Sequence, residues 1–517
     1  MRGRIEERAA RISLVNGLST ALTLAFQLVS VPICLKYWGN GAYGSWLALL
    51  SAFTILRSFD GGFITYVGNE LNSLYHKDQR RLRLHLASAM HGVVVIGAIQ
   101  VGIVGFTFAF EPLARLLGVA HDAVGRQSQL GLLVLMASWA LTGSYLGIVH
   151  RLFIPAGMMY QSAWWGMAFQ VAQFVAIIAA ALLRLDMLET SGLFAAVQIV
   201  IYGASAVYVR RVLPDFLPWL RGGSRGVGLR DLLKSSLLTG SSIIQQGSVG
   251  AIVLVIAAVA GPVAVPAFTT LRTLANLWTS VTTVLTTPLL PEVVRIHAKD
   301  ETSKLAAINS AYWVSVGSAV NLGTLMTYPL IPFFYAHWTG HAVVLNDALL
   351  CLLLATVVVA NAGGLMTLHL NGINSLRLML QAALLRASMS LLVGYFGYRH
   401  WGVASFGFGI FAGEVTATAI TARHFLKFEL AAKGVRMPLG GAGALALGTG
   451  STLAFFIAGG LGVHFGPAAW GPALAGAAGG AIWGWRNLEP ELRARLSGLA
   501  LRWLPLPGSL RHSGRRL

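Results

Sequence analysis

Long apolar stretches divide this chain, and the placing of Lys and Arg between them constrains how it can fold. About fourteen stretches are long enough to cross a bilayer as a helix, which takes about 20 residues. Of the 38 Lys and Arg, 30 lie in every second gap or tail, 5 lie in the alternate gaps and 3 lie inside apolar stretches. Because positive loops stay in the cytoplasm, this alternation predicts a multi-pass membrane protein with both termini cytoplasmic.

Composition supports the same class. The chain has 517 residues, of which 56% are hydrophobic and only 11% are charged, against about 25% charged in soluble domains. The net charge of +19 is explained by the positive loops and by their attraction to anionic lipid headgroups. No gap is long enough to hold a basic domain, so we expect the lipid bilayer as a partner and no nucleic acid.

Motifs for catalysis and cofactors are missing from the sequence. Cys34 and Cys351 lie at or in apolar segments without metal-ligand spacing, and His337 and His341 flank Gly340 in a predicted outer loop. There is no P-loop and no HExxH pattern. The sequence therefore predicts no catalytic residue, no metal, no cofactor and no enzyme activity, and any transport energy has to come from elsewhere.

An internal repeat is indicated by a gap-free match at an offset of 222 residues, which pairs Glu70 with Glu292 and Lys77 with Lys299. We therefore expect an all-α membrane protein of about 14 transmembrane helices, with two parallel six-helix repeats around a central cavity and a C-terminal helix pair. The expected parts are an N-terminal six-helix bundle (1–213), a cytoplasmic linker (214–233), a C-terminal six-helix bundle (234–425), an extra transmembrane pair (438–485) and a basic cytoplasmic tail (486–517).

Polar residues form stripes along three of the predicted helices. The first helix and the eighth carry polar residues in steps of four and three, which places each set on one face. Interhelical hydrogen bonding explains any single member, whereas two full-length stripes favour a hydrated cavity. The members are Asn16, Thr20, Thr23, Gln27 and Ser30 on the first helix, Arg272, Asn276, Thr279, Thr283 and Thr286 on the eighth, and Ser241, Ser242, Gln245 and Gln246 on the seventh.

Charges inside apolar stretches usually mark a transport pathway, because they are costly at membrane depth. Arg57 and Asp60 are three residues apart on one helical face, which favours a neutralised structural pair or a substrate contact. Arg272 has no acidic neighbour in sequence, which favours a role in binding. Arg386 and Glu414 are expected to pair across helices or, for Glu414, to carry a coupling proton.

Several segments resemble the polysaccharide-biosynthesis flippases, the Wzx-like members of the multidrug/oligosaccharidyl-lipid/polysaccharide exporter superfamily. They are KYWGNGAYGSW at 36–46, SFDGGF at 58–63, NELN at 69–72 and TTPLLPE at 286–292. The resemblance implies alternating access, a cationic cavity and an oligosaccharide on polyprenyl diphosphate as substrate. Related lipid II flippases carry Arg on the second and eighth helices, which Arg57 and Arg272 resemble. This chain lacks Arg on the membrane part of the first helix, which points away from lipid II itself.

The sequence thus favours a flippase for a lipid-linked oligosaccharide in the bacterial inner membrane, serving lipopolysaccharide O-antigen or another surface polysaccharide. A polysaccharide polymerase or ligase is the expected protein partner. A cation-coupled exporter of small molecules on the same fold is the alternative, although its cationic substrates favour acidic cavities. A membrane glycosyltransferase or polymerase is favoured less, because the predicted outer loops are short.

The alternation of basic residues makes the topology testable. We expect a cysteine introduced at Ser224, in the basic linker, to react with a membrane-impermeant maleimide only after cells are opened. A cysteine at Gly340, in the predicted outer loop, is the matched control and should react in intact cells. Labelling of position 224 from outside would contradict the assigned orientation.

Overall fold

The chain is helical throughout the part that the computed structural model describes, namely residues 2–75, 77–111, 123–216, 221–286, 289–373, 375–463 and 467–503. These residues contain no strand. Nine of their helices are long and apolar enough to cross a membrane, and a tenth span results if the bent pair Ser236–Ile244 and Gln246–Ala260 counts as one. The predicted all-α membrane class is confirmed, whereas the count of fourteen crossings stays a prediction.

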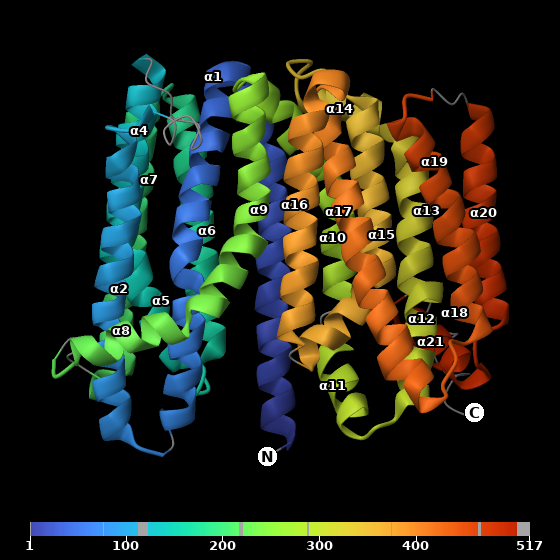
Figure 1. Ribbon diagram of the computed structural model, residues 1–517, viewed down its shortest axis with the longest axis horizontal. Helices are drawn as coiled ribbons and strands as arrows, with labels where there is room; N and C mark the ends of the chain where they lie inside the picture. The colour runs from blue at the N-terminus through green and yellow to red at the C-terminus, as the bar shows by residue number, and fades with distance from the viewer. Residues whose placement is uncertain are drawn as a thin grey trace. The chain divides into compact units, whose positions relative to one another are not determined.

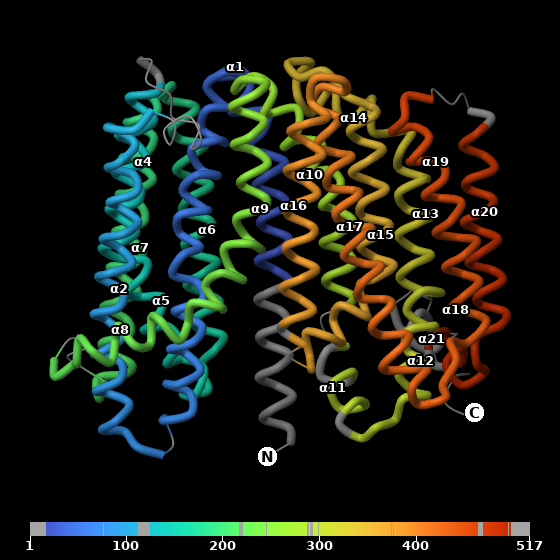
Figure 2. Tube along the Cα trace, in the orientation of Figure 1, coloured from blue at the N-terminus to red at the C-terminus, as the bar shows by residue number. Residues whose placement is uncertain are grey.

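The helices follow the predicted apolar stretches closely (Figures 1 and 2). In chain order they are α1 (Arg2–Tyr75), α2 (Gln79–Thr107), α4 (Ala123–Ser138), η1 (Trp139–Gly143), α5 (Ser144–His150), η2 (Arg151–Phe153), α6 (Met159–Leu182), α7 (Met187–Val212), η3 (Pro214–Phe216), α8 (Arg225–Lys234), α9 (Ser236–Ala260), α10 (Ala264–Thr286), α11 (Leu290–Ala298), α12 (Thr302–Tyr312), η5 (Trp313–Gly317), α13 (Ser318–Thr327), η6 (Tyr328–Leu330), α14 (Ile331–Trp338), α15 (Asp347–Gly372), α16 (Leu376–Trp401), α17 (Ala404–His424), η7 (Phe425–Leu430), η8 (Ala431–Lys433), α18 (Leu439–Gly443), η9 (Ala444–Thr449), α19 (Gly450–Gly460), α20 (Pro467–Arg486) and α21 (Pro490–Trp503).

α1 is two helices joined at Gly39. This residue has φ 73° and ψ 174°, a backbone conformation that side-chain-bearing residues rarely adopt. The break falls in the gap predicted between the first two apolar stretches. Gly39 therefore divides α1 into the two helices that the sequence indicates.

Helix boundaries repeat at nearly the predicted offset. α1 ends at Tyr75 and α2 begins at Gln79, while α11 ends at Ala298 and α12 begins at Thr302. Both boundaries are displaced by 223 residues (298 − 75 and 302 − 79). This agreement supports the repeat locally, and the repeat boundaries themselves stay a prediction.

Contacts between Cα atoms divide the chain into two compact units. The first comprises Met1–Leu277, Pro332–Leu350 and Ala383–Gly413, and the second comprises Trp278–Ile331, Cys351–Ala382 and Glu414–Leu517. In the first unit α2, α4 and α7 lie side by side (Figure 1). In the second, α20 packs against both α13 and α19 (Figure 2).

α1 and α9 approach each other so closely in the first unit that only glycine fits at the contact. A Cβ added to Gly62 would lie 2.1 Å from the backbone nitrogen of Thr239, and one added to Gly250 would lie 3.0 Å from the Ser51 carbonyl oxygen. Membrane helices gain no hydrophobic driving force from each other, so close backbone packing supplies much of their attraction.

The predicted linker is partly helical and docked rather than extended. α8 lies beside α2, where a Cβ on Gly228 would come within 2.3 Å of the Ser88 carbonyl oxygen. The backbone N–H of Ser224 donates to Ser88 Oγ over 2.9 Å. The glycines that suggest a flexible connection thus permit close contact. Residues 217–220 of the linker lie outside the described residues.

The first part of the predicted basic tail forms α21 in the second unit. Its Leu492 and Leu496 pack against a core that contains Val314, Ala444 and Leu488. At least part of its apolar face therefore packs on protein. The remainder of the predicted cytoplasmic tail, 504–517, lies outside the described residues.

The contact between α1 and α9 predicts different responses at two neighbouring glycines. Gly62→Ala should lower the free energy of unfolding by about 3 kcal/mol or more, because overpacking against backbone has no flexible side chain to displace. Gly61→Ala is the matched control, since its Cβ would meet Ser242 at an ordinary 3.7 Å. We expect it to be neutral or up to about 1 kcal/mol stabilising. Thermal unfolding in detergent measures both, and equal losses would contradict the contact.

Candidate functional site

Arg57, in the second helical part of α1, is held by aromatic rings. Its guanidinium carbon lies 5.0 Å from the centroid of the Trp139 ring and 5.8 Å from that of Phe53. A ring face attracts a cation through its negative quadrupole, and the attraction strengthens where water is excluded. The Arg57 guanidinium therefore lies against the faces of two aromatic rings.

Asp60 is buried and is satisfied by neutral donors. Trp139 Nε1 donates to Asp60 Oδ2 over 2.7 Å, and Ser144 Oγ donates to the same oxygen over 2.5 Å. Among the ion pairs of the described residues, none joins Arg57 to Asp60. Arg57 and Asp60 are thus not in direct contact: the Trp139 indole lies against both, with its face toward the cation and its N–H toward the carboxylate. The role of the two residues in substrate binding stays a prediction.

The position of Trp139 depends on the π-helix η1 and on Gly143. A Cβ added to Gly143 would lie 2.3 Å from the Trp139 ring, so the indole occupies space that only glycine leaves open. Phe53 and Tyr202 meet the same ring edge to face at 6.1 and 6.0 Å. π-Helical turns inside α-helices are frequent at functional sites.

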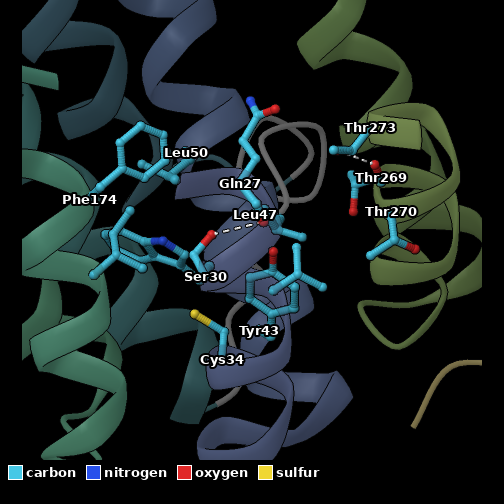
Figure 3. A pocket seen from close by; sticks show the side chains of 13 residues that line it. Gln27, Ser30, Cys34, Tyr43, Leu47, Leu50, Phe174, Thr269, Thr270 and Thr273 are labelled. Atoms are coloured by element: carbon cyan, nitrogen blue, oxygen red, sulfur yellow. Dashed lines mark hydrogen bonds between the residues drawn. The ribbon is translucent and has the colours of Figure 1, made fainter. Parts of the chain in front are cut away.

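A cavity of about 220 Å³ lies elsewhere in the first unit, between α1, α6 and α10 (Figure 3). Its volume is below the roughly 300–1,000 Å³ typical of small-molecule pockets. Gln27 and Phe174 face it from α1 and α6, and three threonines face it from α10 (Figure 3). The lining residues are Gln27, Ser30, Val31, Cys34, Tyr43, Trp46, Leu47, Leu50, Phe174, Ile177, Thr269, Thr270 and Thr273.

The lining combines hydroxyl groups with fixed aromatic rings. Thr270 Oγ1 and the Tyr335 hydroxyl are hydrogen-bonded over 2.8 Å, and Phe26 stacks on Phe174 with centroids 5.0 Å apart. Of the predicted polar stripes, Gln27 and Ser30 on α1 line this cavity. Thr269 and Thr273 were missed, although they extend the polar periodicity of Arg272 and Asn276 toward the start of α10.

Arg272 retains unused hydrogen-bonding capacity. Its guanidinium carbon lies 6.0 Å from the Phe268 ring centroid. Its Nη1 is buried and has no hydrogen-bond partner among the described residues. A buried donor left unpaired costs about 1–3 kcal/mol, and more when it is charged.

The other predicted site residues are less concentrated. Asn276, Thr279, Thr283 and Gln246 are exposed on their helices, whereas the Thr23 hydroxyl donates to the carbonyl of Ser19 in its own helix.

The remaining predicted site residues are members of the polar stripes and the charged residues Arg386 and Glu414. Thr20 is half-buried, while the side chains of Asn16 and Gln245 lie outside the described residues. Arg386 belongs to the first compact unit and Glu414 to the second. Glu414 accepts a hydrogen bond from Thr418 over 3.5 Å, and the ion-coupling role of Arg386 and Glu414 stays a prediction.

The indole N–H of Trp139 can be tested against that of Trp38. Trp139→Phe keeps a ring for Arg57 but removes a donor from the buried Asp60, so it should lower the free energy of unfolding by about 1.5–3 kcal/mol. Trp38 packs on the same core, and its Nε1 is buried without a hydrogen-bond partner among the described residues. Trp38→Phe should therefore cost less. Equal losses in thermal unfolding would show that the hydrogen bond to Asp60 contributes nothing.

No protein-family model matches the chain, and no curated protein matches it in sequence. Solved structures do match its fold. An inward-facing multidrug resistance MATE family transporter of the MOP superfamily aligns with TM-score 0.60 and 15% identity, over 79% of this chain and 96% of that one. The lipid II flippase MurJ, in an inward closed conformation, aligns with TM-score 0.56 and 13% identity, over 94% and 98%.

A third match is a MOP superfamily transporter from Pyrococcus furiosus, described as having a binding pocket of reverse polarity that suggests a different function. It aligns with TM-score 0.50 and 15% identity, over 80% of this chain and 93% of that one. Identities this low establish a shared fold and no more. The chain has the multi-pass membrane fold of the MOP superfamily transporters.

Proposed function

We propose that this protein is a flippase that moves a polyprenyl-diphosphate-linked oligosaccharide across the bacterial inner membrane by alternating access. Arg272 is the observation that carries the proposal. Its buried Nη1 has no hydrogen-bond partner among the described residues. A diphosphate offers the acceptor oxygens that a guanidinium binds best, often through two parallel hydrogen bonds.

Arg57 adds a second central cation in the same unit. Because Asp60 is engaged by Trp139 and Ser144, its hydrogen-bonding capacity is directed at neutral donors and not at Arg57. The side of Arg57 away from the Trp139 ring is then suited to an anionic ligand. Arg57 and Arg272 are two cations, and the carboxylate of Asp60 is already hydrogen-bonded. This balance of charge favours a diphosphate over a cationic drug.

Sugars would be bound by the hydroxyl and amide groups along α1 and the first part of α10. Asn276 is exposed, and such a polar group at membrane depth is tolerated where it faces water or protein and not lipid. The cavity of about 220 Å³ is too small for an oligosaccharide. Substrate entry would therefore require the helices around it to separate, as alternating access provides.

A cation-coupled small-molecule exporter is the second candidate, and a specific observation favours it. The cavity contains Tyr43, Trp46 and Phe174, and aromatic faces bind organic cations. However, no Asp or Glu lines that cavity. The lining supports an exporter of neutral aromatic compounds more than one of cations.

The proposal includes the setting in which the protein works. The alternation of basic residues supports cytoplasmic termini. A complete lipid-linked oligosaccharide is made on the cytoplasmic face and consumed on the other, so a polysaccharide polymerase or ligase is the partner we propose. O-antigen synthesis for lipopolysaccharide is one such setting.

Deletion of the gene in its host tests the function directly. We expect a complete oligosaccharide to accumulate on its polyprenyl carrier at the cytoplasmic face, with surface polysaccharide lost. An exporter would instead leave the lipid-linked pool unchanged and raise sensitivity to small toxic compounds. A missing glycosyltransferase would leave an incomplete oligosaccharide.

Substitution of Arg272 tests the site. Arg272→Ala should insert at normal level, yet weaken substrate binding roughly 10- to 100-fold, because it removes a charge-assisted contact of about 1.5–3 kcal/mol. Arg272→Lys should retain part of the activity as a point charge. Arg399→Ala, at the exposed end of α16, is the matched control. Full complementation of surface polysaccharide by Arg272→Ala would remove the main support for the proposal.

A further inference from the structure

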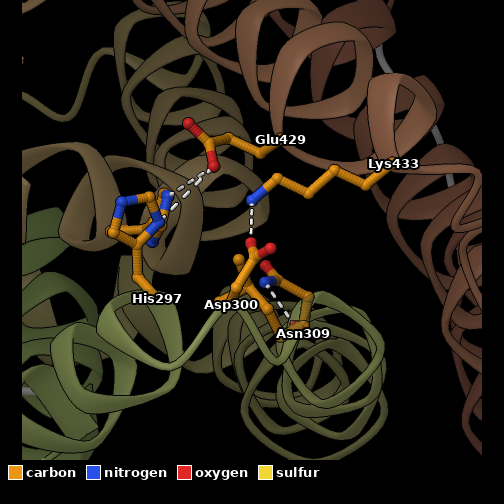
Figure 4. Close-up of polar contacts among 7 residues, drawn as sticks. His297, Asp300, Asn309, Glu429 and Lys433 are labelled. Atoms are coloured by element: carbon orange, nitrogen blue, oxygen red, sulfur yellow. Dashed lines mark hydrogen bonds and ion pairs between the residues drawn. The ribbon is translucent and has the colours of Figure 1, made fainter.

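Three metal-ligating side chains from distant parts of the sequence converge in the second unit. His297 lies near the end of α11, His369 near the end of α15, and Glu429 in η7. One ligand atom from each lies within 4.8 Å of the other two. Figure 4 shows Glu429 lying between His297 and Lys433.

The two separations from Glu429 suit a shared metal ion better than direct hydrogen bonds. His297 Nδ1 lies 3.5 Å from Glu429 Oε2, and His369 Nε2 lies 3.7 Å from the same oxygen. Both are longer than a good N–H to oxygen bond of 2.7–3.2 Å. Around a tetrahedral zinc with bonds of about 2.0–2.2 Å, ligand atoms lie roughly 3.3–3.6 Å apart.

The second observation is that His369 is fully buried and that neither of its ring nitrogens has a hydrogen-bond partner among the described residues. Buried polar atoms are almost always satisfied, so a ring whose Nδ1 has no partner among the described residues and whose Nε2 meets only Glu429 at 3.7 Å requires an explanation. A neutral imidazole has one nitrogen lone pair available, which a metal ion accepts.

The surroundings hold these side chains in place. The His369 ring packs edge to face on Phe425 at 5.5 Å, and Phe425 belongs to a core with Ile296 and Leu430. Ile296 is next to His297 and Leu430 is next to Glu429 in the sequence. Lys433 is paired with Asp300, and this partner holds the pKa of the Lys433 ammonium above its ordinary value. The ammonium therefore stays charged, and its hydrogen bond is made to Asp300 and not to Glu429.

We propose that His297, His369 and Glu429 bind one divalent transition-metal ion of the zinc type, with the fourth position open to a water molecule. Two imidazoles and one carboxylate suit Zn²⁺, Co²⁺ or Ni²⁺, whereas Mg²⁺ and Ca²⁺ prefer oxygen ligands alone. The ion ties the turn between α11 and α12 to the ends of α15 and α17. This site is independent of the transported substrate.

The experiment uses the full chain, purified without a histidine tag, stripped with a chelator and titrated with Zn²⁺ by calorimetry. We expect one ion per chain and a rise in the thermal midpoint on binding. His369→Gln and Glu429→Gln should each weaken binding by more than the roughly 10- to 100-fold that loss of an outer-shell partner costs. His400→Gln, at an exposed histidine of α16, is the matched control and should bind as the parent does.

A gain-of-signal variant keeps the test valid if a glutamine variant fails to fold. His297→Cys should retain binding, and with Co²⁺ it should show a thiolate-to-cobalt absorption band that the parent lacks. Absence of binding by the parent protein, equal affinity in all variants, equal binding of Mg²⁺, or no thiolate band would each overturn the proposal. A response to protons without any to Zn²⁺ would identify the cluster as a protonation site only.

Discussion

The close backbone contact between α1 and α9 is the constraint on which the first unit depends. Gly62 and Gly250 allow the two helices to approach until no side chain fits between them. The same part of α1 carries Arg57 and Asp60. Their positions are consequently set by backbone packing, which yields little, and not by the rotamers of long side chains. The site can therefore hold charges at membrane depth in a fixed geometry.

In the first unit, Asp60, Arg57 and Arg272 have different kinds of partner. Asp60 receives two neutral donors, and Arg57 lies over two aromatic faces. Arg272 has one ring contact and a buried nitrogen without a hydrogen-bond partner among the described residues. A charged group with its hydrogen bonds made stabilises the folded protein. A charged group with a donor left unpaired is stabilised most when a ligand binds, because the ligand supplies the missing hydrogen bond. This contrast singles out Arg272 as the group with the most to gain from an anion.

Features that depend on a single helix, such as its length and its polar face, can be predicted from the sequence. Contacts between different helices cannot. Apolar length and Gly39 mark the helices and the break in α1, and polar periodicity places Gln27 on the cavity-facing side. Helical spacing suggests that Arg57 and Asp60 can pair, yet it contains no information about Trp139, which is 79 residues beyond Asp60. His297, His369 and Glu429 are separated by 72 and 60 residues, so no local spacing signals their convergence. Such groupings depend on helix packing, which a single sequence does not display.

The shared fold leaves substrate choice to a few charged groups. Structures of this fold are described as multidrug transporters and as a lipid II flippase, so the backbone alone does not select an anion or a cation. A charge about 4 Å from Arg272 would interact with about 4 kcal/mol at an effective dielectric constant near 20. The sign is favourable for a phosphate and unfavourable for a cation, which separates the two by several orders of magnitude in affinity. At Arg272 this charge term exceeds the attraction of about 0.5–2 kcal/mol that one aromatic ring, such as the neighbouring Phe268, would offer a cation.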